Sequence, residues 1–299
     1  MLVILIEAPA DYDYEQDYDE DGRRKVAGMA LRLCVLGSSS GGNCTYVASD
    51  TTAILVDAGL SGKETARRLA VLGVEVSSIR AICLTHEHSD HTAGLAILQR
   101  NGGLQLYANS GTIEGVELRL GQGVLKWNVF ATGSPFQVGD LSIEPFSVPH
   151  DAYDPVGFVI GQGVFRVGVV TDMGVVTGLI RERLKHCNAV VVESNHDERL
   201  LKEADRPWHL KQRISGRQGH LSNEHAAELV AEIAGPELSA VFLAHLSEEC
   251  NRPDLALRTV GRSLERLGLK HVAVKIAPAD AISDLWVGDP AAVAAVPPR

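Results

Sequence analysis

Hydrophobic positions along the chain form short runs that alternate with amphipathic segments. Residues spaced three and four apart predict helices over Lys63–Leu72, Thr92–Gln99, Val176–Lys185, Pro253–Leu267 and from an N-cap at Ser222 to Ile233. The apolar runs predict strands over Leu31–Leu36, Ala53–Val56, Ile79–Leu84, Leu141–Val148, Val164–Val170, Ala189–Val192, Val241–Ala244 and Val272–Ile276. This alternation predicts an α/β (α+β) protein with a sizeable core.

The two ends of the chain do not follow this pattern. Residues 1–28 include the acidic run Asp11–Asp21 and show no apolar period, so we expect a disordered tail. The folded domain should span 29–288, and the Ala/Pro-rich segment 289–299 should be frayed. The net charge of −10 is concentrated at the start, because eight of the 38 acidic residues and only three of the 28 basic residues lie in the first 29 positions. The remaining chain is only mildly acidic, which neither supports nor excludes a polyanionic substrate.

Cysteine usage and hydropathy favour a cytoplasmic protein. The five cysteines are widely spaced and include no CxxC pair, which is typical of buried free thiols in a reducing compartment. No apolar run approaches the roughly 20 residues of a membrane span. The apolar Met1–Ile6 has no basic residues before it, so we expect no secretory signal and no membrane partner.

Four potential metal ligands fall within the six residues from His86 to His91, directly after a predicted strand. In an extended chain, positions i and i+2 point the same way, so His86 and His88 are placed to bind one cation together. Asp90 and His91 lie where the chain turns into the next helix and are placed to face a second cation. Imidazole and carboxylate ligands suit Zn²⁺ or a similar ion. The alternative is a solvated polar loop.

This HxHxDH string resembles the signature of the metallo-β-lactamase fold, which implies a single-domain, four-layer αββα sandwich. Asp57 in Val-Asp-Ala-Gly is similar to the first motif of that fold, whose aspartate supports the metal-binding loop. His150 in Val-Pro-His-Asp is similar to the third motif and would complete the first metal site. Taken alone, Asp57 could cap a turn and His150 could be a core histidine.

The same resemblance extends to the fourth and fifth motifs. Asp172 in Val-Thr-Asp-Met-Gly would bridge both metals, and His245 in Leu-Ala-His-Leu-Ser would complete the second site. Each has the same ordinary alternatives as Asp57 and His150. The resemblance implies a cofactor of two divalent ions, Zn²⁺ or Mn²⁺, that activate a water molecule.

Several further strings resemble one branch of this fold, the YycJ/WalJ type. They are Gly37–Asn43, Leu60–Lys63, Glu193–Asp197, Pro207–Arg213, Gly219–Glu224 and Ala244–Glu249. The branch implies a metal-dependent 5′-to-3′ exonuclease that acts on DNA. The sequence by itself decides neither DNA against RNA nor exonuclease against endonuclease, and the resemblance favours DNA. One departure is visible in the first string, where Ser39 replaces an inner glycine and Gly41 follows Ser40. We interpret this string as a tight turn near the site, with phosphate binding by its backbone as an alternative.

Glu193 and His220 are candidate catalytic residues, together with Asp90. They resemble a Glu–His pair in tRNA-processing relatives, where the carboxylate orients an imidazole that protonates the departing sugar oxygen. The alternative is that both residues cap neighbouring elements. His196 and His209 are weaker candidates for a substrate role, and a structural role is the favoured interpretation of both.

The segment from Arg206 to His220 contains four basic residues and no acidic residue. Basic side chains with an interleaved aromatic ring can follow a phosphate backbone and stack on an unpaired base. The candidates for the substrate path are Arg206, Trp208, Lys211, Arg213 and Arg217. An ordinary solvated helix face is the alternative.

Three functions remain open at this point. The first is phosphodiester hydrolysis of nucleic acid, favoured by the basic segment and the branch resemblance. The second is a small-molecule hydrolase, such as a glyoxalase II-like thioesterase or a lactonase, which would share the metal motifs. The third is a regulatory module with a vestigial site, which the complete ligand set disfavours. Asp172 and His245 are 73 positions apart, and two helices and a strand are expected between them, so no inserted domain is expected there.

Overall fold

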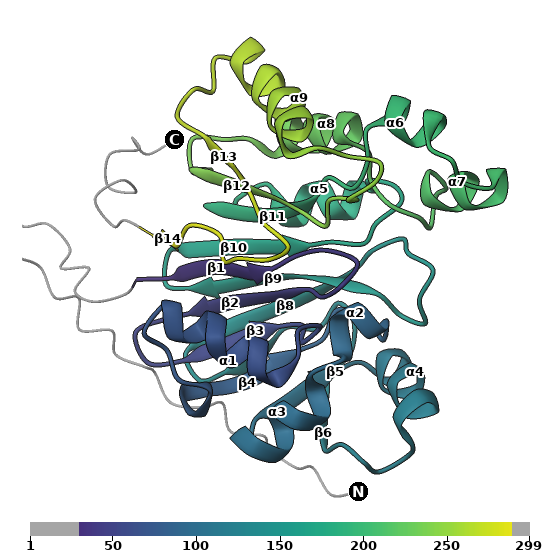
Figure 1. Cartoon of the computed structure of the whole chain (residues 1–299). Helices are drawn as coiled ribbons and strands as arrows, with labels where there is room; N and C mark the ends of the chain where they lie inside the picture. Colours follow the sequence, from purple (N-terminus) through teal and green to yellow (C-terminus); the bar gives the residue numbers. More distant parts are fainter. Residues whose placement is uncertain (1–29, 289–299) are drawn as a thin grey trace, which may run out of the picture.

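Two seven-stranded β-sheets lie face to face at the centre of the structure, a computed structural model that describes residues 30–288 (Figure 1). In sheet order, the first contains β14 (Trp286–Val287), β1 (Arg32–Gly37), β2 (Cys44–Ala48), β3 (Ala53–Val56), β4 (Ile79–Cys83), β5 (Gln105–Ala108) and β6 (Trp127–Val129). The second contains β13 (Ala273–Ile276), β12 (Ala240–Ala244), β11 (Ala189–Glu193), β10 (Phe165–Val170), β9 (Val156–Gln162), β8 (Leu141–Ser147) and β7 (Phe136–Val138).

Helices cover the outer face of each sheet. On the first sheet they are α1 (Gly62–Val71), α2 (Ser89–Thr92), α3 (Leu95–Gly102) and α4 (Ser110–Leu120), with a 3₁₀ turn at Val76–Ser78. On the second sheet they are α5 (Gly178–Leu184), α8 (Asn223–Ile233) and α9 (Pro253–Arg266). The short helices α6 (Glu198–Glu203) and α7 (Trp208–Ile214) lie to one side, and α7 has no buried residue. The predicted four-layer αββα architecture is therefore confirmed. The predicted tails, 1–28 and 289–299, lie outside the described residues.

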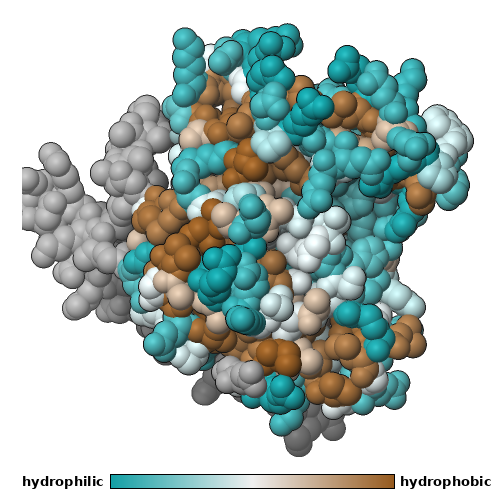
Figure 2. All heavy atoms as spheres, in the orientation of Figure 1, coloured by the Kyte–Doolittle hydropathy of each residue, from teal (hydrophilic) through white to brown (hydrophobic). Residues whose placement is uncertain are grey.

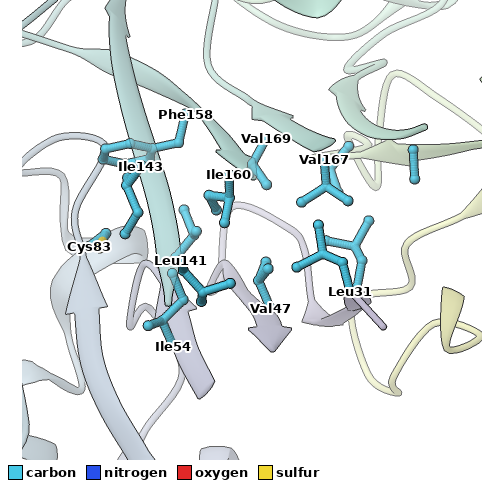
Figure 3. Packing of buried hydrophobic residues seen from close by; sticks show 14 of the residues in the cluster. Leu31, Val47, Ile54, Cys83, Leu141, Ile143, Phe158, Ile160, Val167 and Val169 are labelled. Carbon is cyan, nitrogen blue, oxygen red and sulfur yellow. The ribbon is translucent and has the colours of Figure 1, made fainter. Parts of the chain in front are cut away.

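The apolar runs of the sequence are strands that are buried on both faces. In β11, Ala189 and Val191 face the core between the sheets, whereas Val190 and Val192 pack beneath the helices. A strand covered on both sides has no solvent face, so its sequence is continuously apolar rather than alternating. Figure 3 shows the core between the sheets, with Leu31, Val47, Ile54, Cys83, Leu141, Ile143, Phe158, Ile160, Val167 and Val169.

Parallel strands bring distant parts of the chain to one edge of each sheet. β3 pairs with β4 in parallel, and β10, β11 and β12 pair in parallel in the other sheet. Asp57, Asp172 and His245 follow the ends of β3, β10 and β12, and their φ angles are 64°, 55° and 54°. They are the only residues other than glycine with positive φ in the part of the chain that the structure describes. Non-glycine residues in this region cost free energy and cluster at functional sites, which directs attention to this edge.

The helix predicted over Thr92–Gln99 is wrong in its extent. α2 ends at Thr92 and α3 begins at Leu95, with Gly94 at the junction. The amide of Gly94 donates to the carbonyl of Ala58 (2.7 Å), and a Cβ on Gly94 would lie 2.2 Å from the carbonyl oxygen of Leu60. The loop after β3 therefore packs into the break. This contact joins segments far apart in sequence, so local spacing does not reveal it.

Other predictions agree with the structure. The Ser222 hydroxyl caps α8 by accepting from the amide of His225, as expected. All five cysteines are buried and free. Between Asp172 and His245 the two expected helices and the strand are present, but α6 and α7 were not predicted. Across residues 30–288, no helix is both long and apolar enough to cross a bilayer.

Candidate metal centre

His86, His88 and His150 form one cluster at the edge where the two sheets meet. One ring nitrogen from each lies within 4.8 Å of the others. His88 Nδ1 and His150 Nε2 are 3.3 Å apart. The Nδ1–H group of His150 is directed at the carbonyl of Gly219 (3.2 Å), which leaves its Nε2 as the free ligand atom. The structure thus brings together the three residues predicted for the first metal.

Asp90, His91, His245 and Asp172 form the adjacent cluster. His91 Nε2 lies 3.5 Å from Asp90 Oδ2 and 3.1 Å from Asp172 Oδ2. His245 Nε2 lies 3.6 Å from Asp90 Oδ2, and its Nδ1 lies 3.1 Å from Asp172 Oδ1. Asp172 also shares a candidate metal group with His86 and His91, so it lies between the two clusters.

Asp57 supports the second cluster through hydrogen bonds. Its Oδ2 accepts from Nδ1 of His91 (2.8 Å), which directs Nε2 of that ring toward Asp172. Its Oδ1 accepts from the amide of Thr85 (2.8 Å), and the Thr85 hydroxyl is within 3.0 Å of Nδ1 of His86. Sequence reasoning identified Asp57 but missed Thr85, which connects this carboxylate to both clusters.

Glu193 is fully buried and accepts four hydrogen bonds. Its Oε1 lies 2.8 Å from Nδ1 of His220 and 2.8 Å from Nδ1 of His245. Its Oε2 accepts from the amides of Met173 (2.9 Å) and Leu221 (3.0 Å). With these acceptor positions in use, the carboxylate is suited to orient the two imidazoles rather than to bind a metal.

Charge balance at the centre depends on the imidazoles. Burial would raise the pKa of Asp172, but His245 and His91 hold it well below its usual range. Burial would lower the pKa of His220, but the carboxylates of Glu193 and Asp172 raise it above its usual value. Burial and the neighbouring His91 lower the pKa of His86. These shifts favour the protonated form of His220 and the neutral form of His86, which leaves one ring nitrogen of His86 with a lone pair for a cation.

The buried polar atoms at the centre fit divalent cations. His86 Nε2, Asp172 Oδ2 and His245 Nε2 are buried without a hydrogen-bond partner among residues 30–288. Although His91 Nε2 is 3.1 Å from Asp172 Oδ2, the proton of this ring is directed at Asp57 through Nδ1. The lone pairs of His91 Nε2 and Asp172 Oδ2 therefore face one another. Each buried polar group left unsatisfied in this way costs about 1–3 kcal/mol. A cation shared by such nitrogen and oxygen atoms removes that cost.

The loop between β1 and β2 contributes side chains that the sequence interpretation did not assign. Asn43 Nδ2 donates to Asp90 Oδ2 (3.2 Å), and the Asn43 amide donates to the Asp90 carbonyl (2.7 Å). Ser38 Oγ donates to Asn43 Oδ1 (2.8 Å) and accepts from the amide of His245 (2.8 Å). The loop was expected to be a tight turn near the site. The serine and asparagine of its Ser-Ser-Ser-Gly-Gly-Asn string were the signal for these contacts.

The predicted substrate-path residues lie on and around α7, and two of them are paired with acids from other segments. Arg206 pairs with Glu249 (2.5 Å), and Arg213 pairs with Asp151 (2.6 Å). Arg217 is exposed and forms no ion pair within the described part of the chain. Figure 2 shows a largely hydrophilic surface over α6 and α7, at the upper right. No acidic residue lies within this segment of the sequence, but the fold brings acidic residues of other segments into contact with it.

Asp57→Asn tests the supporting hydrogen bonds. The amide can donate toward Nδ1 of His91 where the carboxylate accepts, so His91 should be misdirected while the residue volume is kept. We expect metal affinity to fall by about 10–100-fold, the range for losing a ligand-orienting partner. Isothermal titration with Zn²⁺ measures this. Asp140→Asn, at a site away from the cluster where a carboxylate accepts from Ser49 (2.7 Å), is the control and should leave the affinity unchanged.

Comparisons with known proteins agree with this geometry. Residues 52–245, which include all the candidate metal ligands, match the family model of the Beta-lactamase superfamily domain. The fold is similar to the metallo-beta-lactamase fold protein YhfI from Bacillus subtilis, with a TM-score of 0.66 and 17% identity over 87% of this chain and 100% of that one.

Two curated relatives are similar over most of their length. Exodeoxyribonuclease YycJ from Bacillus anthracis is 37% identical over 241 residues, 80% of this chain and 91% of that protein. Exodeoxyribonuclease WalJ from Streptococcus pneumoniae is 34% identical over 244 residues, 81% of this chain and 91% of that protein. The chain therefore belongs to the YycJ/WalJ family within the beta-lactamase superfamily.

Proposed function

We propose that this chain is an exodeoxyribonuclease that uses two divalent cations and releases nucleotides from the 5′ end of DNA. The observation that carries the proposal is the His220–Glu193 pair, which lies beside the two ligand clusters. Metal activation alone would serve many hydrolases, but a proton donor beside the metals suits a poor leaving group such as a sugar oxygen. The YycJ and WalJ relatives carry the name exodeoxyribonuclease.

The proposed first cation would be held by His86, His88 and His150. The proposed second would be held by Asp90, His91 and His245, with Asp172 facing both clusters. Nitrogen and carboxylate ligands suit Zn²⁺ and Mn²⁺. Bound cations would lower the pKa of a water molecule and stabilise charge on the phosphoryl oxygens.

The protein side chains have separate roles in this proposal. Glu193 accepts the Nδ1–H of His220 (2.8 Å), which leaves Nε2–H to be donated. The neighbouring carboxylates raise the pKa of this imidazole despite its burial, which favours the protonated form that a general acid needs. It then gives that proton to the leaving oxygen.

A substrate panel tests the proposal against a small-molecule hydrolase. The metal-loaded protein is offered single- and double-stranded DNA and RNA with 5′-phosphates, beside thioesters and lactones. We expect mononucleotides from DNA, slower release from RNA, and no thioester or lactone hydrolysis above the metal-free control. Thioester turnover without nucleic-acid cleavage would instead make the chain a glyoxalase II-like enzyme.

The salt dependence of DNA binding tests the substrate path. Each phosphate contact on a single strand contributes about 0.7 to the log–log slope of affinity against salt concentration. Arg217→Gln should reduce the slope by about this amount, because this side chain has no acidic partner in the described structure. Arg206→Gln should reduce it less, since Glu249 already neutralises that guanidinium (2.5 Å). Equal slopes in both variants and wild type would show that the segment is a solvated surface.

A further inference from the structure

An open pocket of about 310 Å³ lies beside His220, between α6, α7 and the start of α8. Its walls include His196, Glu198, Lys202, Trp208 and Lys211. Only His220 among them belongs to the catalytic pair described above. The volume lies at the lower end of the range for small-molecule sites, so it suits one nucleotide rather than a length of strand.

We propose that this pocket binds the terminal nucleotide of the DNA strand, the nucleotide whose 3′-oxygen leaves. This inference rests on the proposed function. It assigns a binding site to a specific part of the substrate, with Trp208 and His196 contacting the base and Lys202 contacting the 5′-phosphate.

The position of His220 determines which side of the scissile phosphate faces the pocket. Water adds to phosphorus and the bond from phosphorus to the 3′-oxygen breaks. His220 supplies the proton to that oxygen, and the proton lost by the water passes to solvent. The products are a terminal nucleotide with a free 3′-hydroxyl and a shortened strand with a new 5′-phosphate. Because the donor touches the leaving oxygen, the departing nucleotide lies on the side of His220, where the pocket opens.

Trp208 provides a surface for stacking. The side chain is 68% exposed at the first position of α7 and lines the pocket. By contrast, Trp286 is only 9% exposed and packs in the core between the sheets. A ring exposed in this way is free to stack, and an unpaired base is a flat apolar partner of suitable shape.

His196 provides a polar atom for the base edge. It is 2% exposed and lines the pocket, and its Nδ1 has no hydrogen-bond partner among the described residues. Burial lowers its pKa to about 4, so the ring is neutral near pH 7 and one nitrogen can accept while the other donates. A base edge offers both donors and acceptors, so it can satisfy this atom.

Two lysines that line the pocket, Lys202 and Lys211, are placed to contact the 5′-phosphate in this proposal. Lys202 is exposed and forms no ion pair within the described residues, and the Lys211 ammonium donates to the Lys202 carbonyl (2.7 Å) at the junction of α6 and α7. Glu198 lies one turn before Lys202 on α6, within 3.5 Å of the Ser222 hydroxyl at the start of α8, and disfavours an anion at that end of the pocket. The charges therefore place the phosphate by the lysines and the base toward His196 and Trp208.

Calorimetric binding of two small ligands to the metal-loaded protein tests the proposal. Deoxyadenosine 5′-monophosphate and 2-deoxyribose 5-phosphate carry the same phosphate and sugar, so any contact with the metals contributes similarly to both. Wild type should bind the nucleotide at least about fivefold more tightly than the sugar phosphate, because of the stacked base. Trp208→Ala should bring this ratio close to one, and Trp208→Phe should largely retain it. His196→Gln, which keeps a polar end, should lower the ratio less than His196→Leu.

A second pair of variants tests the contact between Lys202 and the 5′-phosphate. Lys202→Ala should weaken the binding of both ligands several-fold, whereas Lys185→Ala, an exposed lysine remote from the pocket, should change neither. A ratio near one in wild type, or a ratio that Trp208→Ala does not change, overturns the proposed pocket even if the protein degrades DNA. If the ratio behaves as expected but no nucleic acid is cleaved, the nucleotide site stands and the proposed exonuclease function fails.

Discussion

Asp90→Ala is expected to abolish DNA hydrolysis while the protein stays folded. Asp90 Oδ2 faces both His91 Nε2 (3.5 Å) and His245 Nε2 (3.6 Å), so its removal takes the carboxylate from the second cluster. Charge stabilisation by a metal contributes several kcal/mol to catalysis, so turnover should fall by about 10³-fold or more. The backbone carbonyl that accepts from the Asn43 amide remains, so the loop contact is kept.

The measurements for Asp90→Ala are metal content and turnover on single-stranded DNA. Wild type should hold two equivalents after loading with Zn²⁺ or Mn²⁺ and dialysis, and the variant should hold one. Ser89→Ala, an exposed neighbour in the same short helix, is the control and should behave as wild type. Full turnover in Asp90→Ala would contradict the role proposed for the second cluster.

His220→Ala is expected to lower turnover by about 10²–10⁴-fold, the contribution of a positioned general acid. DNA affinity and metal content should change little, because a proton donor acts mainly in the transition state. Glu193→Gln should also lower turnover, because the charge that raises the pKa of His220 is gone and the amide nitrogen cannot accept the hydrogen bonds that one carboxylate oxygen accepts.

A change of leaving group separates proton donation from metal binding at His220. A p-nitrophenyl phosphodiester releases a stable anion that needs no proton. His220→Ala should therefore hydrolyse this compound at nearly the wild-type rate while cleaving DNA slowly. An equal loss on both substrates would show that His220 acts in another way, for example as a metal ligand.

The sequence predicts much of this site because several of its residues are close neighbours in the chain. His86, His88, Asp90 and His91 follow one strand, and local geometry alone directs them to a common edge. Asp172 and His245 are recognisable only through the family motifs, since their proximity to the histidines depends on the two sheets packing together.

Contacts between distant side chains could not be predicted from spacing. In the sequence, Thr85 is an ordinary polar residue that follows a strand. Its contacts with Asp57 and His86 are seen only in the folded structure. The same holds for Arg213, which meets Asp151 across 62 positions. The number of basic residues in the sequence therefore overestimates the positive charge on α7 that is available to bind phosphates.

Two buried strands were also missed for a physical reason. β2 and β9 are buried strands whose sequences contain Thr, Gly or Gln, so their apolar runs are interrupted. Pairing with neighbouring strands stabilises them despite that composition. Tertiary packing, rather than local propensity, accounts for these strands.

The proposed exodeoxyribonuclease activity is tested by the products formed from DNA with a labelled 5′ end, before and after chelation of the metals. We expect the metal-loaded protein to release the label as a mononucleotide from the earliest times. Release should stop after chelation and return when Zn²⁺ or Mn²⁺ is restored. Release that persists without metal, or internal fragments that appear before any mononucleotide, would contradict the proposed metal-dependent exodeoxyribonuclease.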